Sequence, residues 1–340
     1  MWAALRTAHT YTIFKKLTES MKLAFIIDPI AKLDPAHDTS VALMEAACRK
    51  GHEVFITNMN TLSVKDGKAW AFLQSSKIYP VPLVDGKWQV PNPWYEVAEG
   101  KFQPLEDMQF VWMRPDPPVT TEYLYATYIL DYVDTSKTKV LNSPQGIRAA
   151  NEKMYALQFT KAIPKTIVTA DKGTIRDFVA AVGKAVMKPL GGKGGEGILF
   201  LEVGDRNMNS MIEISTNIGK TPVMVQEYLP DAQKGDKRII LLDGEPIGAV
   251  NRVPQSGEFR GNMAAGGSAV QVNITDREQE ICNQLAPILR RDGLMFVGID
   301  VIGGYLTEVN VTSPTGVREI DRLDGVCLGD RVMDWLVTLA

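Results

Sequence analysis

The sequence has little of the sulfur and imidazole chemistry on which many functional sites depend. Its 340 residues include three cysteines and three histidines. The cysteines lie far apart, without the C-x-x-C spacing of a thiolate zinc site, and an odd, sparse count argues against a disulfide scaffold. Such usage suits a reducing compartment, so we expect a cytoplasmic protein. All three histidines precede residue 53, so catalysis later in the chain must use lysine, arginine, carboxylates, amides or backbone groups.

Long apolar runs and an excess of one charge are also absent. No apolar stretch approaches the roughly 18 residues of a membrane-spanning helix, so we expect no membrane span. Thirty-seven lysines and arginines stand against forty aspartates and glutamates, which argues against a broadly basic nucleic-acid-binding protein. Hydrophobic residues make up 45% of the chain and charged residues 23%, as in globular proteins, and the length indicates two or three packed lobes.

The first part of the chain carries the pattern of a parallel α/β lobe. A short apolar run at 22–27 predicts a buried strand, the Asp-Thr-Ser sequence at 38–40 predicts the start of a helix, and 53–57 predicts the next strand. Strand–helix–strand order is typical of parallel sheets, and we assign this lobe to 21–142. Two Asp-Gly turn signals within 66–90 predict an inserted hairpin.

Residues 1–20 precede this pattern and are expected to form a loose N-terminal extension. They carry three basic residues against one acidic residue, and they lack the apolar core and cleavage site of a secretory signal. A short organelle transit peptide and an over-extended start ahead of Met21 are the alternatives.

The remaining residues, 143–340, have the rhythm of two α+β lobes. Short strands and helices alternate with hairpins, which predicts a central lobe at about 150–228 and a C-terminal lobe at about 229–340. Within the second, Thr275 and Glu278 have the spacing of a capping box and predict the start of a long helix.

The densest glycine cluster is Gly-Gly-Lys-Gly-Gly-Glu-Gly at 191–197. It satisfies the G-x-G-x-x-G pattern of dinucleotide-binding folds, but that motif must precede a helix, whereas strand-like Ile-Leu-Phe-Leu follows at 198–201. We therefore reject the dinucleotide interpretation and predict a flap between two strands, whose backbone amides approach phosphate oxygens. Lys188, just upstream, favours this role because a lysine beside the loop would neutralise a phosphate. The alternative is a plain hairpin tip.

Three oxygen-bearing side chains near the C-terminus, Asp300, Glu308 and Asn310, have metal-ligand spacing. Glu308 and Asn310 share a strand face, and a three-residue loop at 303–305 would place Asp300 opposite Glu308. A two-residue loop would instead oppose Asp300 to Thr307, on the wrong face. The set predicts an all-oxygen Mg²⁺ site that also bridges to substrate phosphates. The alternative is a pair of solvent-facing acids on an edge strand.

Several longer motifs resemble those of the bacterial-type glutathione synthetases, in the ATP-grasp superfamily. The resemblance covers about residues 21–340, and its motifs are 25–30 (FIIDPI), 113–118 (MRPDPP), 126–130 (ATYIL), 151–153 (NEK), 188–192 (KPLGG), 235–238 (GDKR), 260–267 (RGNMAAGG) and 307–315 (TEVNVTSPT). The last two are specific to the family rather than to the superfamily. Pro115 is a mild departure from the family pattern, and residues 1–20 have no counterpart in it.

The resemblance implies an ATP-grasp fold, in which an α/β lobe leads into two α+β lobes that clasp ATP. It implies ATP-dependent ligation of γ-glutamylcysteine to glycine through an acyl phosphate, giving glutathione, ADP and phosphate. It also implies a homo-oligomer, a dimer or a tetramer, and no nucleic-acid or membrane partner.

The resemblance further implies roles for individual residues. ATP would be bound by Lys153, Lys188, Gly191, Gly192, Gly194, Gly195, Gln226, Glu227, Tyr228, Leu229 and Asp236. Mg²⁺, with Mn²⁺ as the alternative, would be held by Asp300, Glu308 and Asn310. Arg238, Arg252 and Arg260 would serve the dipeptide and the transferring phosphoryl group. The other substrate residues would be Asp28, Ser40, Arg114, Gly266 and Gly267.

The segment 253–267, rich in glycine, alanine and asparagine with Arg260 at its middle, is expected to be a lid that excludes water from the acyl phosphate. Three other functions compete with this one. They are another ATP-grasp carboxylate–amine ligase such as a dipeptide ligase, a nucleotide-binding regulator without catalysis, and an interaction scaffold.

Overall fold

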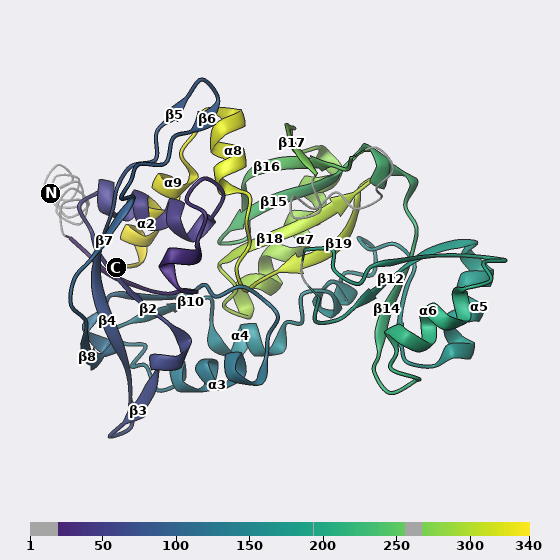
Figure 1. Ribbon diagram of the computed structural model, residues 1–340, viewed down its shortest axis with the longest axis horizontal. Coiled ribbons are helices and arrows are strands. Elements are labelled where there is room, and N and C mark those ends of the chain that lie inside the picture. Colours follow the sequence, from purple (N-terminus) through teal and green to yellow (C-terminus); the bar gives the residue numbers. More distant parts are fainter. Residues whose placement is uncertain (1–19, 193, 256–266) are drawn as a thin grey trace, which may run out of the picture.

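We analysed a computed structural model of the chain, which describes residues 20–192, 194–255 and 267–340. These residues form three main sheets arranged along the length of the molecule (Figure 1). The N-terminal sheet lies at one end, a four-stranded sheet lies at the other, and a five-stranded sheet lies between them. This is the α/β architecture of three lobes that the sequence predicts.

The N-terminal sheet has a parallel half and an antiparallel half. Its order is β10-β9-β1-β2-β4-β3, with β7 and β8 also pairing with β4. The parallel strands are β1 (Lys22–Ile26), β2 (Glu53–Thr57), β9 (Phe110–Met113) and β10 (Lys139–Leu141). The antiparallel strands are β3 (Ser63–Lys65), β4 (Lys68–Ile78), β7 (Tyr95–Val97) and β8 (Lys101–Pro104).

The predicted Asp-Gly turns and the predicted helix start both occur in this lobe. Asp66-Gly67 joins β3 to β4, and Asp85-Gly86 joins β5 (Leu83–Val84) to β6 (Lys87–Trp88), all four residues with positive φ. Asp38 caps α2 (Thr39–Arg49) by accepting a hydrogen bond from the Val41 amide. The other local helices are η1 (Ile30–Lys32), η2 (Met59–Thr61), η3 (Leu105–Asp107), α3 (Thr121–Leu130) and α4 (Pro144–Ala149).

The four-stranded sheet forms the central lobe with its own small core. Its order is β11-β14-β12-β13, all antiparallel, and α5 and α6 cover one face. The elements are β11 (Thr166–Thr169), α5 (Lys172–Val182), β12 (Lys184–Pro189), β13 (Leu199–Glu202), α6 (Met208–Ser215) and β14 (Val223–Glu227). The short helix η4 (Met154–Gln158) precedes this lobe, and η5 (Pro230–Lys234) follows it.

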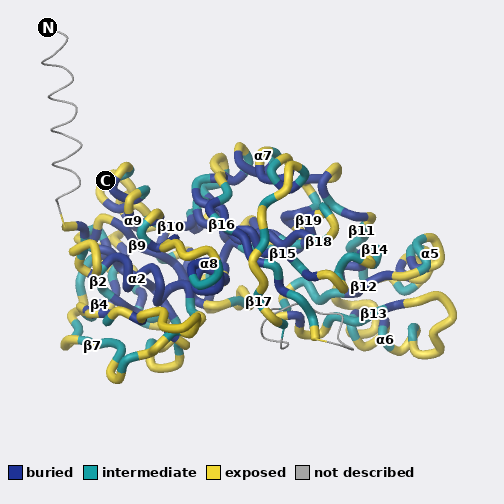
Figure 2. Tube along the Cα trace, turned by 90° about the horizontal axis from the view of Figure 1, so that it is seen from above, coloured by how far each residue is buried: buried dark blue, intermediate teal, exposed yellow. Residues whose placement is uncertain are grey.

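The five-stranded sheet is antiparallel throughout, in the order β17-β16-β15-β18-β19. Its elements are β15 (Asp236–Leu242), β16 (Glu245–Val253), β17 (Ser268–Gln271), α7 (Asp276–Arg291), β18 (Phe296–Ile302) and β19 (Tyr305–Asn310). The predicted capping box is present, because the Thr275 side chain accepts from the Glu278 amide and Glu278 accepts from the Thr275 amide. Along the tube in Figure 2, the strands of this sheet are largely buried.

The last two helices return to the N-terminal lobe. Both α8 (Val317–Asp324) and α9 (Leu328–Leu339) pack against α2, and their apolar side chains join the core beneath β1. The α2–α9 contact is close, since a Cβ on Gly329 would lie 2.8 Å from the Ala46 side chain. The N-terminal and five-stranded sheets therefore share their cores. In the described part of the chain, no helix has the length and apolar character needed to cross a membrane.

Candidate active site

One cleft of about 900 Å³ is bounded by all three lobes. Its walls come from the glycine loop and strands of the central lobe, from the five-stranded sheet, and from loops of the N-terminal lobe. The lining includes most of the residues that the sequence singles out: Lys153, Lys188, Gly192, Gly194, Gly195, Gln226, Glu227, Tyr228, Leu229, Asp236, Arg238, Arg252, Asp300, Glu308 and Asn310. Residues that lie up to 157 positions apart in the sequence are thus brought to a single site.

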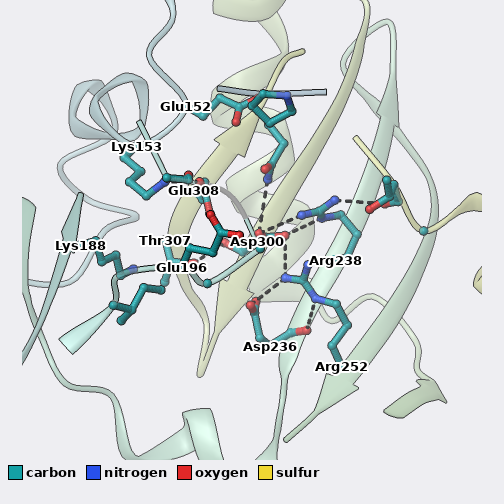
Figure 3. Close-up of a pocket in the computed structure, with 18 of the residues that line it drawn as sticks. Glu152, Lys153, Lys188, Glu196, Asp236, Arg238, Arg252, Asp300, Thr307 and Glu308 are labelled. Carbon is teal, nitrogen blue, oxygen red and sulfur yellow. Dashed lines mark hydrogen bonds and ion pairs between the residues drawn. The ribbon is translucent and has the colours of Figure 1, made fainter. Parts of the chain in front are cut away.

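Two lysines, the buried Lys153 and the half-buried Lys188, stand at the central-lobe side of the cleft (Figure 3). Lys153 Nζ donates to the Gly192 carbonyl at 2.8 Å and lies 3.0 Å from Glu308 Oε1. Lys188 Nζ donates to Gln226 Oε1 at 2.9 Å, and burial lowers the pKa of Lys188. Both ammonium groups are held by neutral or acidic oxygens, which a phosphate would replace or share.

The glycine loop joins β12 to β13, so it is a strand–loop–strand connection, as predicted. Gly194, Gly195 and Gly197 have positive φ, which side chains with a Cβ rarely adopt. Gly192, Gly194 and Gly195 line the cleft, whereas Gly191 does not.

The end of β14 and the residues after it form a wall of the cleft that carries both apolar and polar groups. Gln226, Glu227, Tyr228 and Leu229 line the cleft together with Val186 and Ile198, and the Tyr228 ring meets Phe200 edge-on at 5.1 Å. Gln226 is fixed on both sides, because its Nε2 also donates to Thr166 Oγ1 at 3.1 Å. A planar heterocycle would find apolar faces and backbone polar groups here.

A cluster of two arginines and two aspartates forms the floor of the cleft (Figure 3). Arg238 donates to both oxygens of Asp300, at 2.6 and 3.0 Å, and Arg252 Nη2 lies 3.0 Å from Asp300 Oδ1. Burial disfavours the charge on Asp300, but Arg238 and Arg252 outweigh this effect and hold the pKa of Asp300 below its usual range.

Asp236 completes this cluster and has one open acceptor. Its Oδ2 accepts from Arg252 Nη2 at 2.7 Å. Its Oδ1 is buried, and none of the described residues donates to it. Burial raises the pKa of Asp236, an effect that Arg252 offsets only in part. A buried acceptor of this kind indicates a donor supplied by a ligand.

Asp300 and Glu308 are paired across β18 and β19, as predicted, but through a different loop. The loop has two residues, Gly303 and Gly304, with φ of 56° and 79°, and not the three residues expected. A register shift next to Asp300 leaves Thr307 without a partner and returns Glu308 to the position opposite Asp300. A two-residue loop alone would place Thr307 opposite Asp300 and turn Glu308 to the other face of the sheet. The bulge adds one residue to β19 and so keeps Glu308 on the same face as Asp300.

Asn310 joins this pair through its amide nitrogen, which donates to Gly298 O at 3.2 Å and Asp300 Oδ2 at 3.3 Å. Its amide oxygen accepts no hydrogen bond from the described residues. Within the described ranges there is no group of three or more His, Cys, Asp or Glu arranged to hold a metal ion. Two carboxylates and an amide oxygen fit a hard cation that completes its shell with water and phosphate oxygens, rather than a protein-only cage.

The N-terminal candidates Asp28, Ser40 and Arg114 stand behind the cleft instead of lining it. Arg114 is buried. Its Nε donates to Ser40 Oγ at 3.1 Å, and its Nη2 donates to the Pro314 carbonyl at 3.1 Å. Asp28 accepts from the Asp116 amide at 3.0 Å. These residues hold the chain at Asp116, which lines the cleft, and at Pro314, whose neighbours Ser313 and Thr315 line it. Gly267 precedes β17 outside the lining, while Arg260 and Gly266, with most of the expected lid, lie outside the described residues.

The structure adds polar residues that the sequence analysis did not select. Glu152 accepts at Oε1 from the Val311 amide (2.9 Å), the Thr312 amide (3.1 Å) and Thr312 Oγ1 (2.8 Å). Burial raises the pKa of Glu152, and the charge of Glu308 adds to the effect. Glu152 belongs to the 151–153 motif and could have been found there. Glu319, at the other end of the cleft, follows the 307–315 motif by four residues.

Comparison with known families decides what this site belongs to. The family model for the N-terminal domain of prokaryotic glutathione synthetase matches residues 21–148, and the model for the ATP-grasp domain of the same enzymes matches 152–325. The chain belongs to the prokaryotic glutathione synthetases. It is an ATP-grasp ligase of glutathione biosynthesis, as the sequence motifs imply.

Relatives in cyanobacteria support this conclusion along nearly the whole chain. The chain is 67% identical to the glutathione synthetase of Thermosynechococcus vestitus over 316 residues, 93% of this chain and 99% of that relative. It is 66% identical to the glutathione synthetase of a Nostoc species, over 93% of this chain and 98% of the relative. This similarity disfavours the competing ligase, regulator and scaffold functions.

Solved structures show the same fold at low sequence identity. The D-cycloserine synthetase DcsG superposes with a TM-score of 0.62 at 16% identity, covering 93% of this chain and 99% of that chain. The ATP-grasp ligase PsnB, complexed with its minimal precursor, gives 0.61 at 18% identity, covering 94% and 99%. These likenesses establish the ATP-grasp fold.

Proposed function

We propose that this enzyme joins γ-glutamylcysteine to glycine with ATP, through an acyl phosphate on the cysteinyl carboxylate, and releases glutathione, ADP and phosphate. The observation that carries the proposal is the convergence of Lys153 and Lys188 with the Arg238–Arg252–Asp300 cluster and Glu308 in a single cleft. Phosphoryl transfer needs positioning and charge neutralisation more than a protein nucleophile, and these residues can supply both.

The central lobe and the residues beside it would bind the nucleotide. Lys153, Lys188 and the glycine loop, through Gly192, Gly194 and Gly195, would bind the phosphates. The wall from Gln226 to Leu229 would take the adenine, because it offers apolar faces beside a backbone edge. Asp236, with its open buried oxygen, would accept a hydrogen bond from the ribose hydroxyls.

The arginines of the five-stranded sheet would serve the reacting groups. Arg238 and Arg252 are buried cations whose charge is balanced by Asp300 and Asp236 before any substrate binds. An incoming carboxylate and γ-phosphate would share these guanidiniums, which stabilise negative charge as it moves between them. The positioned amine of glycine would then attack the acyl phosphate.

We propose Mg²⁺ as the divalent metal, held by Asp300, Glu308 and Asn310, with Mn²⁺ as the alternative. The all-oxygen donor set and the open amide oxygen of Asn310 support this assignment. When bound, the metal supplies positive charge to the polyphosphate. Glu308 would leave Lys153 to bind it, which would free the lysine for phosphate.

Asp28, Ser40 and Arg114 would position the substrate wall beside the N-terminal lobe, since they hold Asp116 and the Pro314 carbonyl, between the lining residues Ser313 and Thr315. Gly267 directly precedes β17 and would be the last residue of the connection that leads into this strand. We propose the lobe division 21–142 and 143–340, with a central part at about 150–228 and a C-terminal part at about 229–340. A homo-oligomer and a cytoplasmic location complete the proposal, the latter in keeping with the sparse cysteines.

A coupled assay tests the proposal. Purified enzyme with ATP and Mg²⁺ should release ADP only when γ-glutamylcysteine is present, and one glutathione should form per phosphate when glycine is added. ADP release that is indifferent to γ-glutamylcysteine, or a dipeptide product from other amino acids at equal rate, would refute the substrate assignment.

A further inference from the structure

The end of the cleft built by the N-terminal lobe differs in charge from the end that holds the lysines. Its lining includes a single lysine, Lys32, among acidic groups and one histidine: Asp34, His37, Asp38, Asp116 and Glu319. Four of the five lysines and arginines in the lining thus lie where phosphate and carboxylate are proposed to bind, whereas the acids where the N-terminal lobe meets α8 have only Lys32 and His37 among them. A ligand that spans it should carry a cationic group at the acidic end.

Glu319 is the most enclosed of these acids. The residue is 7% exposed, and its Oε1 lies 2.8 Å from His37 Nδ1. The described residues offer no donor to the second carboxylate oxygen. Since Glu319 lines the cleft, this second oxygen is available to a cationic or hydrogen-bonding ligand there. Glu319 also lies in the first turn of α8, where the helix dipole favours its negative charge.

The loop before α8 fixes the distance between Glu319 and the metal-site residues. Glu152 accepts from the Thr312 amide, Arg114 donates to the Pro314 carbonyl, and Arg238 Nη1 donates to the Thr315 carbonyl at 3.0 Å. Three charged side chains from separate parts of the sequence thus tie down the few residues that connect Asn310 to Glu319. Because this connection is restrained, the distance between Glu319 and the metal-site residues is fixed. A substrate that contacts both must therefore have a matching length.

The proposed dipeptide has the matching arrangement of charges. Its cysteinyl carboxylate must lie beside the lysines and arginines to be phosphorylated, while its opposite, glutamyl end carries an α-ammonium for the acids and an α-carboxylate for Lys32. We propose that Glu319, positioned by His37, binds the α-ammonium of the glutamyl residue and so selects γ-glutamyl dipeptides over analogues without the amine. This inference rests on the proposed substrate and deepens it.

The test compares γ-glutamylcysteine with N-glutarylcysteine, which lacks only the α-ammonium. The wild-type enzyme should prefer the natural dipeptide by about tenfold or more in kcat/KM, the loss expected for one charge-assisted hydrogen bond. Glu319→Gln should lower kcat/KM for γ-glutamylcysteine by about ten- to 100-fold and leave that for N-glutarylcysteine within about twofold. The KM for glycine and calorimetric ATP binding should stay unchanged.

The matched control is Asp324→Asn, at the exposed end of the same helix, which should leave the preference intact. His37→Ala should reduce the preference less than Glu319→Gln, since it removes only the group that orients the carboxylate. An equal loss with both dipeptides in Glu319→Gln, or a raised KM for glycine instead, would overturn this inference while glutathione formation by the wild type upholds the proposed function. A wild-type enzyme that forms no glutathione from γ-glutamylcysteine would overturn both.

Discussion

The central lobe and the rest of the molecule are stabilised in different ways. The central lobe, β11 to β14 with α5 and α6, has its own core of eight buried side chains among the described residues: Ile175, Val179, Ala185, Met187, Leu201, Ile212, Val223 and Val225. The N-terminal sheet and the five-stranded sheet share two larger cores, one of which includes side chains of α7 and the other side chains of α8 and α9. One part is a small independent unit, and the other is a fused body.

The difference matters because the cleft lies between these two parts. The body supplies the Arg238–Asp300 cluster, Glu308 and Asn310, whereas the central lobe supplies Lys188 and the wall from Gln226 to Leu229. Among the described residues, side-chain hydrogen bonds from Lys153 Nζ to Gly192 O and from Asn151 Nδ2 to Leu190 O, at 3.1 Å, link the body to the glycine-loop side. A lobe with its own core and few ties is expected to shift as a unit around the nucleotide while the reacting groups stay fixed.

The largest expected effect is in the body, at Glu308. Glu308→Gln keeps the shape of the side chain but removes the charge that faces Lys153 and the proposed metal. We expect turnover to fall about 100-fold or more, with binding of Mn²⁺ in the presence of an ATP analogue weakened in electron paramagnetic resonance titrations. Glu280→Gln, at an exposed site on α7, serves as the control. Metal-dependent turnover at the wild-type rate would rule out Glu308 as a ligand.

The next prediction separates the stability of the two parts. Ile212 in the central lobe and Ile299 in the body are both fully buried, and truncating either to alanine should cost about 2–5 kcal/mol. Because the central core is small and separate, Ile212→Ala should raise hydrogen exchange within β11–β14 and abolish ATP binding, while the body keeps its protection. Ile299→Ala should lower protection in both shared-core sheets. Uniform loss of protection in Ile212→Ala would show that the molecule unfolds as one unit.

A smaller effect is expected for the central lobe's own phosphate contact. Lys188→Ala should weaken ATP binding by about tenfold or more, since a charge-assisted contact to phosphate contributes roughly 1.5–3 kcal/mol. Isothermal calorimetry with a non-hydrolysable analogue measures it. Lys184→Ala on the same strand is the control, because Lys184 is exposed and pairs with Glu202 outside the cleft. Equal affinity in Lys188→Ala and wild type would remove Lys188 from the nucleotide site.

The sequence predicts the elements of both parts better than it predicts how they join. Strands, Asp-Gly turns and the capping box depend on neighbouring residues, so local patterns reveal them. The pairing of Asp300 with Glu308 was predicted correctly, but from a three-residue loop that the structure does not have. The pairing comes instead from a bulge at Thr307, which depends on packing that residue spacing alone does not encode. The return of α8 and α9 to α2 is a long-range contact, and it explains why Glu319 was missed: its partner His37 is 282 residues away.

The smallest expected effect on turnover concerns the seam where α8 meets α2, inside the body and outside the cleft lining. Burial raises the pKa of Asp321 to about 7, opposed in part by the hydrogen bond from the Leu328 amide and the charge of Arg318. Because the folded pKa lies above the unfolded value near 4, the folded state holds the proton more tightly. The contribution of this group to stability is therefore fully present below about pH 4 and is lost as the pH rises through 7.

Asp321→Asn keeps an acceptor for the Leu328 amide and removes the charge. Its free energy of unfolding relative to wild type should increase between pH 4 and pH 8 by up to roughly 4 kcal/mol, since each pKa unit corresponds to about 1.4 kcal/mol, with Asp324→Asn as the flat control. Denaturant titrations across this range measure the difference. If the difference does not change with pH, Asp321 is already charged in the folded protein, and the seam tolerates a buried carboxylate with Arg318 as its counter-charge.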